Sequence, residues 1–295
     1  MSWLETYRGT VYRWEVDNVD HFTVAYYFAR FEDATLALLQ ALGLDPASLA
    51  GAGQACVTVE CRVGYQRELR VGDILHIRSG VISADREHLA IGHQVFDSGD
   101  GALCTTVLQR MALLQTGTRA VLPLSERQRG AAQALRVECS IEAEPARPSD
   151  PGGEDGFIDT ARDTIKPSEV DLFGQAALPA LVHRFSAANG HLIAAFGMTP
   201  AYMNSERRGF STFEFKLRLP GALRAGDLVR VRSALVHVGN SSLRIFHRLA
   251  NTRTEAVVAT LEQAGVHLDL VARRPTALPE PLRERAKAML VTPAP

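Results

Sequence analysis

An acidic residue precedes an apolar stretch of helical spacing at two places in this 295-residue sequence. Asp17 ends the triplet Glu15-Val16-Asp17, and Asp171 ends the triplet Glu169-Val170-Asp171, 154 residues further along. The start of a helix offers backbone N–H groups without an intrahelical partner and the positive end of the helix dipole, and both favour negative charge. The carboxylate before each helix is therefore the strongest candidate for chemistry in the chain.

The apolar residues after each triplet predict the helix that must position this carboxylate. They are Tyr27, Phe28, Phe31, Leu38, Leu39 and Leu42 in the first copy, and Leu181, Val182, Phe185, Leu192, Ile193 and Phe196 in the second. Pro179 fits the first turn of a helix, where a missing N–H costs nothing, and it corresponds to Ala25 in the first copy. We expect each helix to begin about seven residues after its aspartate and to end at Gly43 or Gly197.

Alternating apolar and polar residues after each helix predict antiparallel strands, most clearly at 58–63 and 212–217. Gly72-Asp73 and Gly226-Asp227 occupy equivalent positions and predict architectural turns between strands. A short strand is also predicted before the first helix, at 7–17. Each copy is thus expected to be an α+β unit, with one sheet wrapped over one long helix.

The internal repeat predicts two domains of similar size. We place the first domain at 1–140, a linker rich in proline and glycine at 141–156, the second domain at 157–289 and a loose tail at 290–295.

The composition excludes several classes of partner. The formal net charge of −1 provides no global positive field for nucleic acid or acidic membranes. No apolar run approaches the roughly 20 residues of a membrane span, and the N-terminus lacks the layout of a secretory signal. We therefore expect a cytoplasmic protein without a metal or cofactor, whose cysteines are reduced thiols rather than disulfides or zinc ligands. These cysteines are Cys56, Cys61, Cys104 and Cys139.

A long helix wrapped by a curled antiparallel sheet, with an acid just before the helix, resembles the hotdog fold of thioesterases. The first copy is similar to the 4-hydroxybenzoyl-CoA thioesterase branch, which begins with an aspartate, a short turn and an aromatic-rich helix that ends in an acidic residue. Here these are Asp-Asn-Val-Asp-His-Phe at 17–22 and Tyr-Phe-Ala-Arg-Phe-Glu at 27–32. The segment 60–69 with Gly72-Asp73 is similar to thioesterases associated with carnitine breakdown. The second copy departs from the pattern, with Asp-Leu-Phe-Gly-Gln at 171–175.

The resemblance implies a tandem double hotdog that hydrolyses an acyl-CoA or acyl-carrier-protein thioester. The two copies would form a pseudo-dimer within one chain, and two chains could form a homodimer. By the resemblance, Asp17 would be the base or nucleophile. The alternative for Asp17 is a turn residue that orders the loop, although it lies too far from the helix for an ordinary N-cap.

Thioester hydrolysis requires an activated water or a nucleophile, together with donors for the developing oxyanion. The N–H groups from Phe22 to Ala25, including that of Val24, are candidate donors, and Tyr27 could line the acyl pocket or belong to the core. His21 could orient water or accept a proton, or it could be a surface residue. Its counterpart in the second copy is Gln175.

Strand residues could assist across the pseudo-dimer. Glu60 and Glu214 occupy equivalent positions, and a period of two predicts that Thr58 and Thr212 share their face. Solvated side chains on the sheet are the alternative for all four. His93 and His247 also coincide in the repeat, and both fall on an apolar face that indicates hydrogen-bonded core histidines.

The two copies predict one competent site and one impaired or specialised site. The Asp17 site is favoured because it has His21 and because Pro179 removes a possible oxyanion donor from the Asp171 site. The alternatives to a hydrolase are a hotdog dehydratase or hydratase acting on 3-hydroxyacyl or enoyl thioesters, and a protein that binds acyl thioesters without catalysis.

Overall fold

The computed structural model describes residues 3–138 and 150–291. The chain forms two compact units, one of residues 1–142 and 167–180, the other of residues 143–166 and 181–295. The units therefore do not follow the sequence repeat strictly, because the segment 167–180 of the second repeat packs within the first unit. Most of the predicted linker lies outside the described residues, and so does Cys139.

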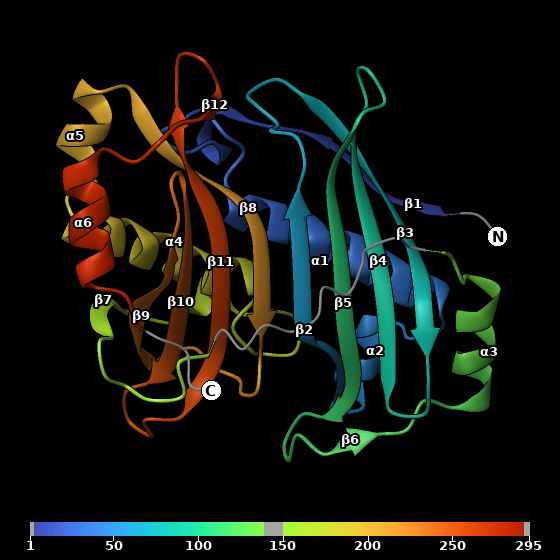
Figure 1. Cartoon of the computed structure of the whole chain (residues 1–295). Coiled ribbons are helices and arrows are strands. Elements are labelled where there is room, and N and C mark those ends of the chain that lie inside the picture. Colours follow the sequence, from blue (N-terminus) through green and yellow to red (C-terminus); the bar gives the residue numbers. More distant parts are fainter. Residues whose placement is uncertain (1–2, 139–149, 292–295) are drawn as a thin grey trace. The chain divides into compact units, whose positions relative to one another are not determined.

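The first unit is an antiparallel sheet in the order β1-β3-β4-β5-β2, with β6 paired to β5. Helix α1 crosses behind β2 to β5 in Figure 1. The elements are β1 (Leu4–Thr10), the 3-10 helix η1 (Arg13–Glu15), α1 (Val24–Ala41), α2 (Pro46–Gly51), β2 (Gln54–Tyr65), β3 (Ile74–Ala84), β4 (His88–Asp97), β5 (Leu103–Gln115), β6 (Val121–Leu122) and α3 (Glu126–Ala134).

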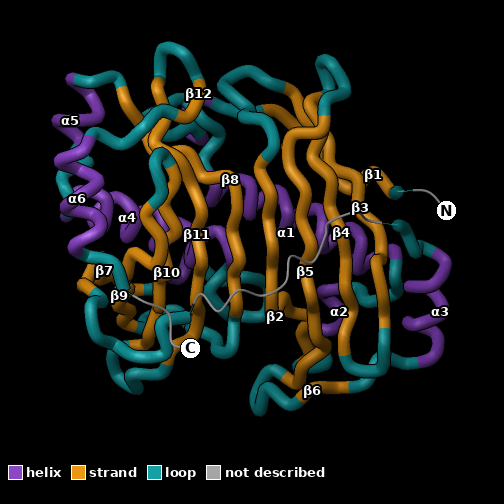
Figure 2. Tube along the Cα trace, in the orientation of Figure 1, coloured by secondary structure: helices purple, strands orange, loops and turns teal. Residues whose placement is uncertain are grey.

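The second repeat has the same plan, and its sheet has the order β7-β9-β10-β11-β8, with β12 paired to β11 (Figure 2). Its elements are β7 (Ile158–Thr164), η2 (Pro167–Glu169), α4 (Leu178–Ala195), α5 (Pro200–Ser205), β8 (Arg208–Arg218), β9 (Leu228–Val238), β10 (Ser242–Asn251), β11 (Val257–Asp269), β12 (Arg274–Pro275) and α6 (Glu280–Ala288). The predicted α+β unit is confirmed in both repeats.

The two long helices begin seven residues after their aspartates, at Val24 and Leu178, as predicted. They end just before Gly43 and Gly197, both of which adopt the left-handed backbone conformation that favours glycine (φ 70° and 106°). The apolar face of α1 is buried against the sheet, and its large side chains contribute about 1.5–3 kcal/mol each.

One predicted strand boundary is wrong. The strand predicted at 7–17 ends at Thr10, because residues 13–15 turn into η1 and Glu15 accepts a hydrogen bond from the Tyr12 N–H (3.0 Å). Of the predicted tail at 290–295, the structure describes only 290 and 291, and the Val291 N–H donates to the carbonyl of Leu235 (2.8 Å). Helices α3 and α6 were not anticipated, although the capping box of Ser125 and Gln128 marks the start of α3.

His93 and His247 are fully buried, and the prediction of core histidines is confirmed. The Nδ1 atom of His93 lies 2.6 Å from Ser79 Oγ, and its Nε2 lies 3.1 Å from Thr35 Oγ1 on α1. His247 has the same 2.6 Å contact with Ser233. Burial lowers the pKa of His93 to about 4 and that of His247 to about 3.

We expect these histidines to make the protein acid-sensitive. The unfolded chain binds protons near pH 6.5 while the folded chain does not, so stability is present above pH 6.5 and is lost as the pH falls toward 4. Each histidine contributes a slope of roughly 1.4 kcal/mol per pH unit in this window. Urea unfolding between pH 7 and pH 4.5 measures the slope, and His93→Asn should reduce it. An unchanged slope in that variant would contradict the assignment.

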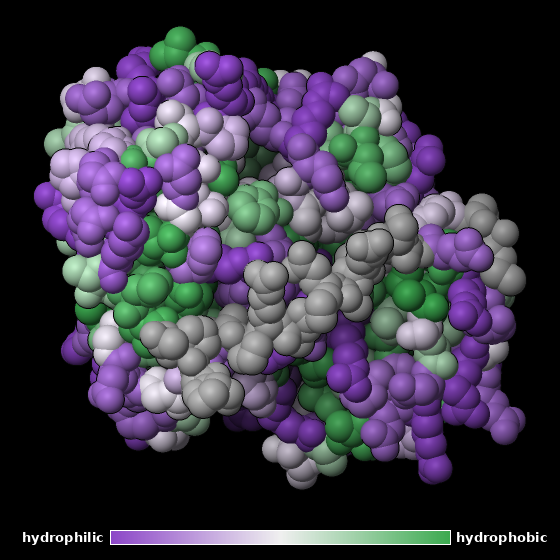
Figure 3. Space-filling model, in the orientation of Figure 1, coloured by the Kyte–Doolittle hydropathy of each residue, from purple (hydrophilic) through white to green (hydrophobic). Residues whose placement is uncertain are grey.

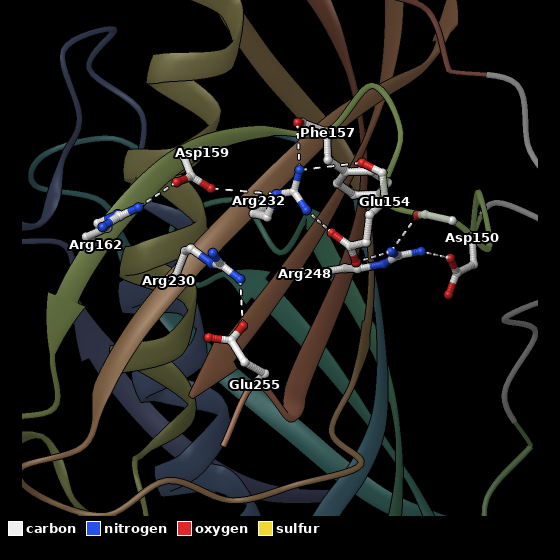
Figure 4. Close-up of polar contacts among 10 residues, drawn as sticks. Asp150, Glu154, Phe157, Asp159, Arg162, Arg230, Arg232, Arg248 and Glu255 are labelled. Carbon is white, nitrogen blue, oxygen red and sulfur yellow. Dashed lines mark hydrogen bonds and ion pairs between the residues drawn. The ribbon is translucent and has the colours of Figure 1, made fainter. Parts of the chain in front are cut away.

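A network of arginines and carboxylates binds the segment that leads into β7 (Figure 4). Arg248 contacts Asp150 (2.5 Å) and Glu154 (2.6 Å), and its guanidinium lies 4.4 Å from the centre of the Phe157 ring. Arg232 pairs with Glu154 and donates to the Phe157 carbonyl (3.0 Å). Residues 150–157, most of which were predicted to be linker, are thus fixed to strands β9 and β10.

On the face drawn in Figure 3, green apolar areas lie between purple polar ones. Among the large apolar side chains of the described residues, Val271 (72%) and Trp14 (69%) are the most exposed, and Trp14 stacks on Tyr12. None of the described helices is both long and apolar enough to cross a membrane.

Candidate active site

Both aspartates of the repeat order the loop that precedes their helix. Asp17 Oδ1 accepts hydrogen bonds from the N–H groups of Val19 (2.9 Å) and His21 (3.0 Å). Asp171 Oδ1 accepts the equivalent bonds from Phe173 and Gln175, each at 2.9 Å. The loop-ordering alternative is therefore present in both copies, and any catalytic role must be compatible with it.

The loop uses two of the N–H groups that were expected to bind the oxyanion. The Phe22 N–H donates to the carbonyl of Leu69 (2.8 Å), so the prediction of Phe22 as a donor is wrong. The Thr23 N–H likewise donates to the carbonyl of Glu15 (2.8 Å). The first N–H of the helix proper is that of Val24 in α1 and that of Leu178 in α4.

The Glu32 carboxylate, on α1, lies at the start of α4. Glu32 Oε1 accepts a hydrogen bond from the Leu178 N–H (3.0 Å), although the two residues lie 146 positions apart in the chain. Pro179 follows without an N–H, so Leu178 supplies the leading donor of this helix. A carboxylate and a backbone donor therefore meet at the positive end of a helix dipole.

The environment shifts the pKa of both carboxyl groups at this point. Burial raises the pKa of Glu32 to about 7; the Leu178 N–H opposes the rise, and the negative charges of Asp171 and Asp33 add to it. Burial also raises the pKa of Asp171, against its hydrogen bonds from Gln175 and Phe173. Two carboxyl groups with raised pKa values beside a helix start are typical of a functional site.

Gln175 and Arg119 complete the cluster. Arg119 Nη1 donates to Gln175 Oε1 (3.2 Å), and burial lowers the pKa of the Arg119 guanidinium. The sequence pointed to Asp171 and Gln175 but missed Glu32 and Arg119. Glu32 could have been noticed as the acid that ends the helix motif, since its equivalent in α4 is Ser186.

The residues around Asp17 form a different arrangement. His21 Nε2 lies 2.7 Å from Glu68 Oε2, and the residue equivalent to Glu68 in the second repeat is Ala222. Tyr27 is buried, and its ring packs against those of Phe22 (4.4 Å between centroids) and Tyr65 (5.2 Å). Tyr27 and Phe22 thus belong to the aromatic core beneath the Asp17 loop.

A β-bulge separates the strand residues that were expected to share a face. Thr58 pairs with the buried Met111, whereas Glu60 pairs with the exposed Arg110. Since Met111 and Arg110 are neighbours in β5, they point to opposite faces of the sheet, and so do Thr58 and Glu60. The prediction that they lie on one face is wrong, and Glu60 points away from α1.

The same bulge recurs in the second repeat. Thr212 accepts a hydrogen bond from the buried Gln263 (2.6 Å), whereas Glu214 lies 3.5 Å from Arg244 and 3.6 Å from Lys216. Glu214 therefore belongs to a charged cluster on the other face of the sheet, with Arg244 and Lys216.

Comparison with known proteins identifies the superfamily of this chain. A family model described as thioesterase-like superfamily matches residues 11–132 and again 165–286. The chain belongs to the thioesterase-like superfamily. Its two matched segments coincide with the two repeats, which makes the chain a double hotdog member of this superfamily.

Individual relatives agree with this assignment. Betainyl-CoA thioesterase of Pseudomonas aeruginosa is 32% identical over 98 residues, which cover 33% of this chain and 62% of that protein, just under two thirds of its length. The fold is similar to that of a crystal structure described as a putative oleoyl thioesterase from Lactobacillus plantarum, with a TM-score of 0.72 at 12% identity over 93% of this chain and 96% of that one. The 12:0-ACP thioesterase from Umbellularia californica gives a TM-score of 0.66 at 14% identity, over 92% and 96%.

In this thioesterase-like chain, the Glu32 cluster combines a carboxyl group whose pKa is about 7 with a backbone donor at a helix start. Glu32 can accept a proton near neutral pH, and the Leu178 N–H can donate to an oxyanion. Among the described residues, no group of three or more His, Cys, Asp or Glu side chains could hold a metal ion.

Proposed function

We propose that this protein hydrolyses acyl thioesters, with Glu32 as the general base and the start of α4 as the oxyanion site. The observation that supports this most is the 3.0 Å hydrogen bond between Glu32 and the Leu178 N–H, at a carboxyl group whose pKa is raised to about 7. A base is most effective when its pKa lies near the working pH.

The same hydrogen bond suggests how the substrate activates the base. When the thioester carbonyl oxygen accepts the hydrogen bond from the Leu178 N–H, Glu32 loses the contact that lowers its pKa. Glu32 then becomes a stronger base. It then removes a proton from water as the water oxygen bonds to the carbonyl carbon. Collapse of the intermediate breaks the C–S bond, and protonated Glu32 returns the proton to the leaving thiolate.

Asp171 acts as a positioning residue in this scheme. Its Oδ1 holds the loop before α4, and its charge helps to keep the pKa of Glu32 high. We therefore favour the Asp171 loop over the Asp17 loop, because the charge of Asp171 acts on Glu32, whose pKa is raised to about 7 at the start of α4.

The names of the relatives suggest the substrate class. One relative is a betainyl-CoA thioesterase, and structural neighbours include acyl-ACP thioesterases. We propose acyl-CoA or acyl-carrier-protein thioesters as the substrates of this chain. Thiol release from a panel of acyl-CoA and acyl-carrier-protein thioesters tests the proposal, and the absence of release from both carriers would overturn it.

The pH dependence should identify the base. We expect kcat/KM to rise with pH through an apparent pKa of about 7, because Glu32 must be ionised to accept a proton. Asp171→Asn keeps the Oδ1 acceptor but removes a negative charge, so its ascending limb should move to lower pH. A limb that stays in place in Asp171→Asn would show that another group titrates.

A hydratase acting on enoyl thioesters is the second candidate. It is favoured by the ion pair of His21 and Glu68 (2.7 Å), since a histidine held by a carboxylate is suited to proton transfer. Loss of enoyl-CoA absorbance without thiol release, abolished by His21→Gln, would support this candidate over hydrolysis.

A further inference from the structure

The repeat retains an arginine where the backbone favours glycine. Arg119 (φ 58°) and Arg273 (φ 51°) occupy equivalent positions and both adopt the left-handed conformation. The other left-handed non-glycine residues of the described chain each have a glycine as their counterpart, in the pairs Asp20 with Gly174, Arg207 with Gly53, and Glu255 with Gly101. A left-handed conformation costs an ordinary residue roughly 1–2 kcal/mol, so we expect each of these arginines to make side-chain contacts of its own that offset the cost.

The turn between β5 and β6 fixes the position of Arg119. Its N–H donates to the carbonyl of Gln115 (2.8 Å), and the Gln115 N–H donates to the carbonyl of Ala120 (2.9 Å). The guanidinium then reaches the loop before α4 through Gln175 Oε1 (3.2 Å), and the N–H of Gln175 is bound by Asp171 (2.9 Å). Arg119 is therefore held beside the loop that carries the candidate site.

The Arg119 guanidinium lacks a counter-ion within the described part of the chain. Its side-chain hydrogen bond goes to the neutral amide of Gln175, and no carboxylate of residues 3–138 or 150–291 forms an ion pair with it. None of its nitrogens is both buried and without a partner, so its remaining donors face solvent. Burial removes water from part of the Arg119 guanidinium, and no neighbouring anion of the described chain offsets this loss. Burial therefore lowers the pKa of the Arg119 guanidinium.

We propose that Arg119 binds an anionic oxygen group of the substrate, either a phosphate of the pantetheine carrier or a carboxylate at the far end of the acyl group. The planar guanidinium can donate two parallel hydrogen bonds to either group. This inference rests on the proposed hydrolysis, and it names the part of the substrate that the site would recognise beyond the thioester.

The test uses Arg119→Gly, because glycine accepts the left-handed backbone and the variant should fold. Arg273→Gly is the matched control at the equivalent turn. Butyryl-CoA is compared with butyryl-N-acetylcysteamine, which has no phosphate, and with glutaryl-N-acetylcysteamine, which has only a terminal carboxylate.

Loss of a charge-assisted hydrogen bond should raise KM by about 10- to 100-fold. A rise for butyryl-CoA alone identifies the phosphate, and a rise for the glutaryl ester alone identifies the carboxylate. An equal effect on all three substrates, no effect, or the same effect in Arg273→Gly would overturn the proposal.

Equilibrium binding separates this inference from the hydrolysis itself. Calorimetric titration with CoA and with glutarate requires no turnover, and Arg119→Gly should weaken the binding of one of them. Arg119-dependent binding in a protein that cleaves no thioester would refute hydrolysis but keep the anion site. If the protein hydrolyses thioesters but Arg119→Gly binds CoA and glutarate as well as the native chain does, the anion site would be refuted and hydrolysis would be kept.

Discussion

Glu32→Gln is expected to lower kcat for thioester hydrolysis by about 10²–10⁴-fold, the range for loss of a general base. Glutamine retains an Oε1 that can accept from the Leu178 N–H (3.0 Å in the native chain), so the start of α4 should stay in place. What disappears is the proton acceptor with a pKa of about 7, and with it the ascending limb of the pH profile. Thiol release under saturating substrate measures the effect.

Asp17→Asn is the informative companion variant, because Asp17 occupies the equivalent loop of the first repeat and keeps its Oδ1 acceptor as asparagine. Under the present proposal, this variant should retain most of the activity. A Glu32→Gln enzyme with nearly native kcat beside an inactive Asp17→Asn enzyme would transfer the reaction to the Asp17 loop.

Arg30→Met is expected to destabilise the protein by about 3–5 kcal/mol, the usual cost of leaving one member of a buried ion pair without its partner. Glu15 is only 3% exposed, and its carboxylate accepts from Arg30 and from the Tyr12 N–H (3.0 Å). The Arg30 guanidinium also lies 5.4 Å from the centre of the Tyr7 ring. Urea unfolding at neutral pH, followed by circular dichroism, measures the loss.

Arg8→Met is the matched control, since Arg8 pairs with Glu5 on the surface at 2.8 Å, where ion pairs are worth about 0–1 kcal/mol. The double variant Glu15→Gln/Arg30→Met should recover part of the stability, because it removes the unpaired buried charge. Equal losses in Arg30→Met and Arg8→Met would show that burial of Glu15 is not what makes the pair important.

The sequence alone determined the repeat and its local structure. The start of both long helices, the glycines that end them and the buried histidines follow from spacings of a few residues, where local backbone preferences and hydrophobic periodicity dominate. The superfamily could likewise be recognised from the order of these pieces, and the matches at 11–132 and 165–286 confirm it.

The register of the strands was harder to predict from the sequence. A period of two places Thr58 and Glu60 on one face, but one inserted residue at the bulge reverses that relation. Nothing in the alternation of side chains at 58–63 marks the bulge, because it depends on how β2 pairs with β5. The same limit explains why the N–H of Phe22 was counted as free although Leu69 accepts from it.

The candidate site was decided by tertiary structure. Glu32 ends a motif whose other residues form core, and the chain itself gives no reason to connect it with Leu178, 146 residues away. Only folding brings this carboxylate to the start of α4, where burial and the nearby charge of Asp171 raise its pKa to about 7. Local patterns specify helices and turns, whereas the pKa of a group depends on whatever the fold packs around it.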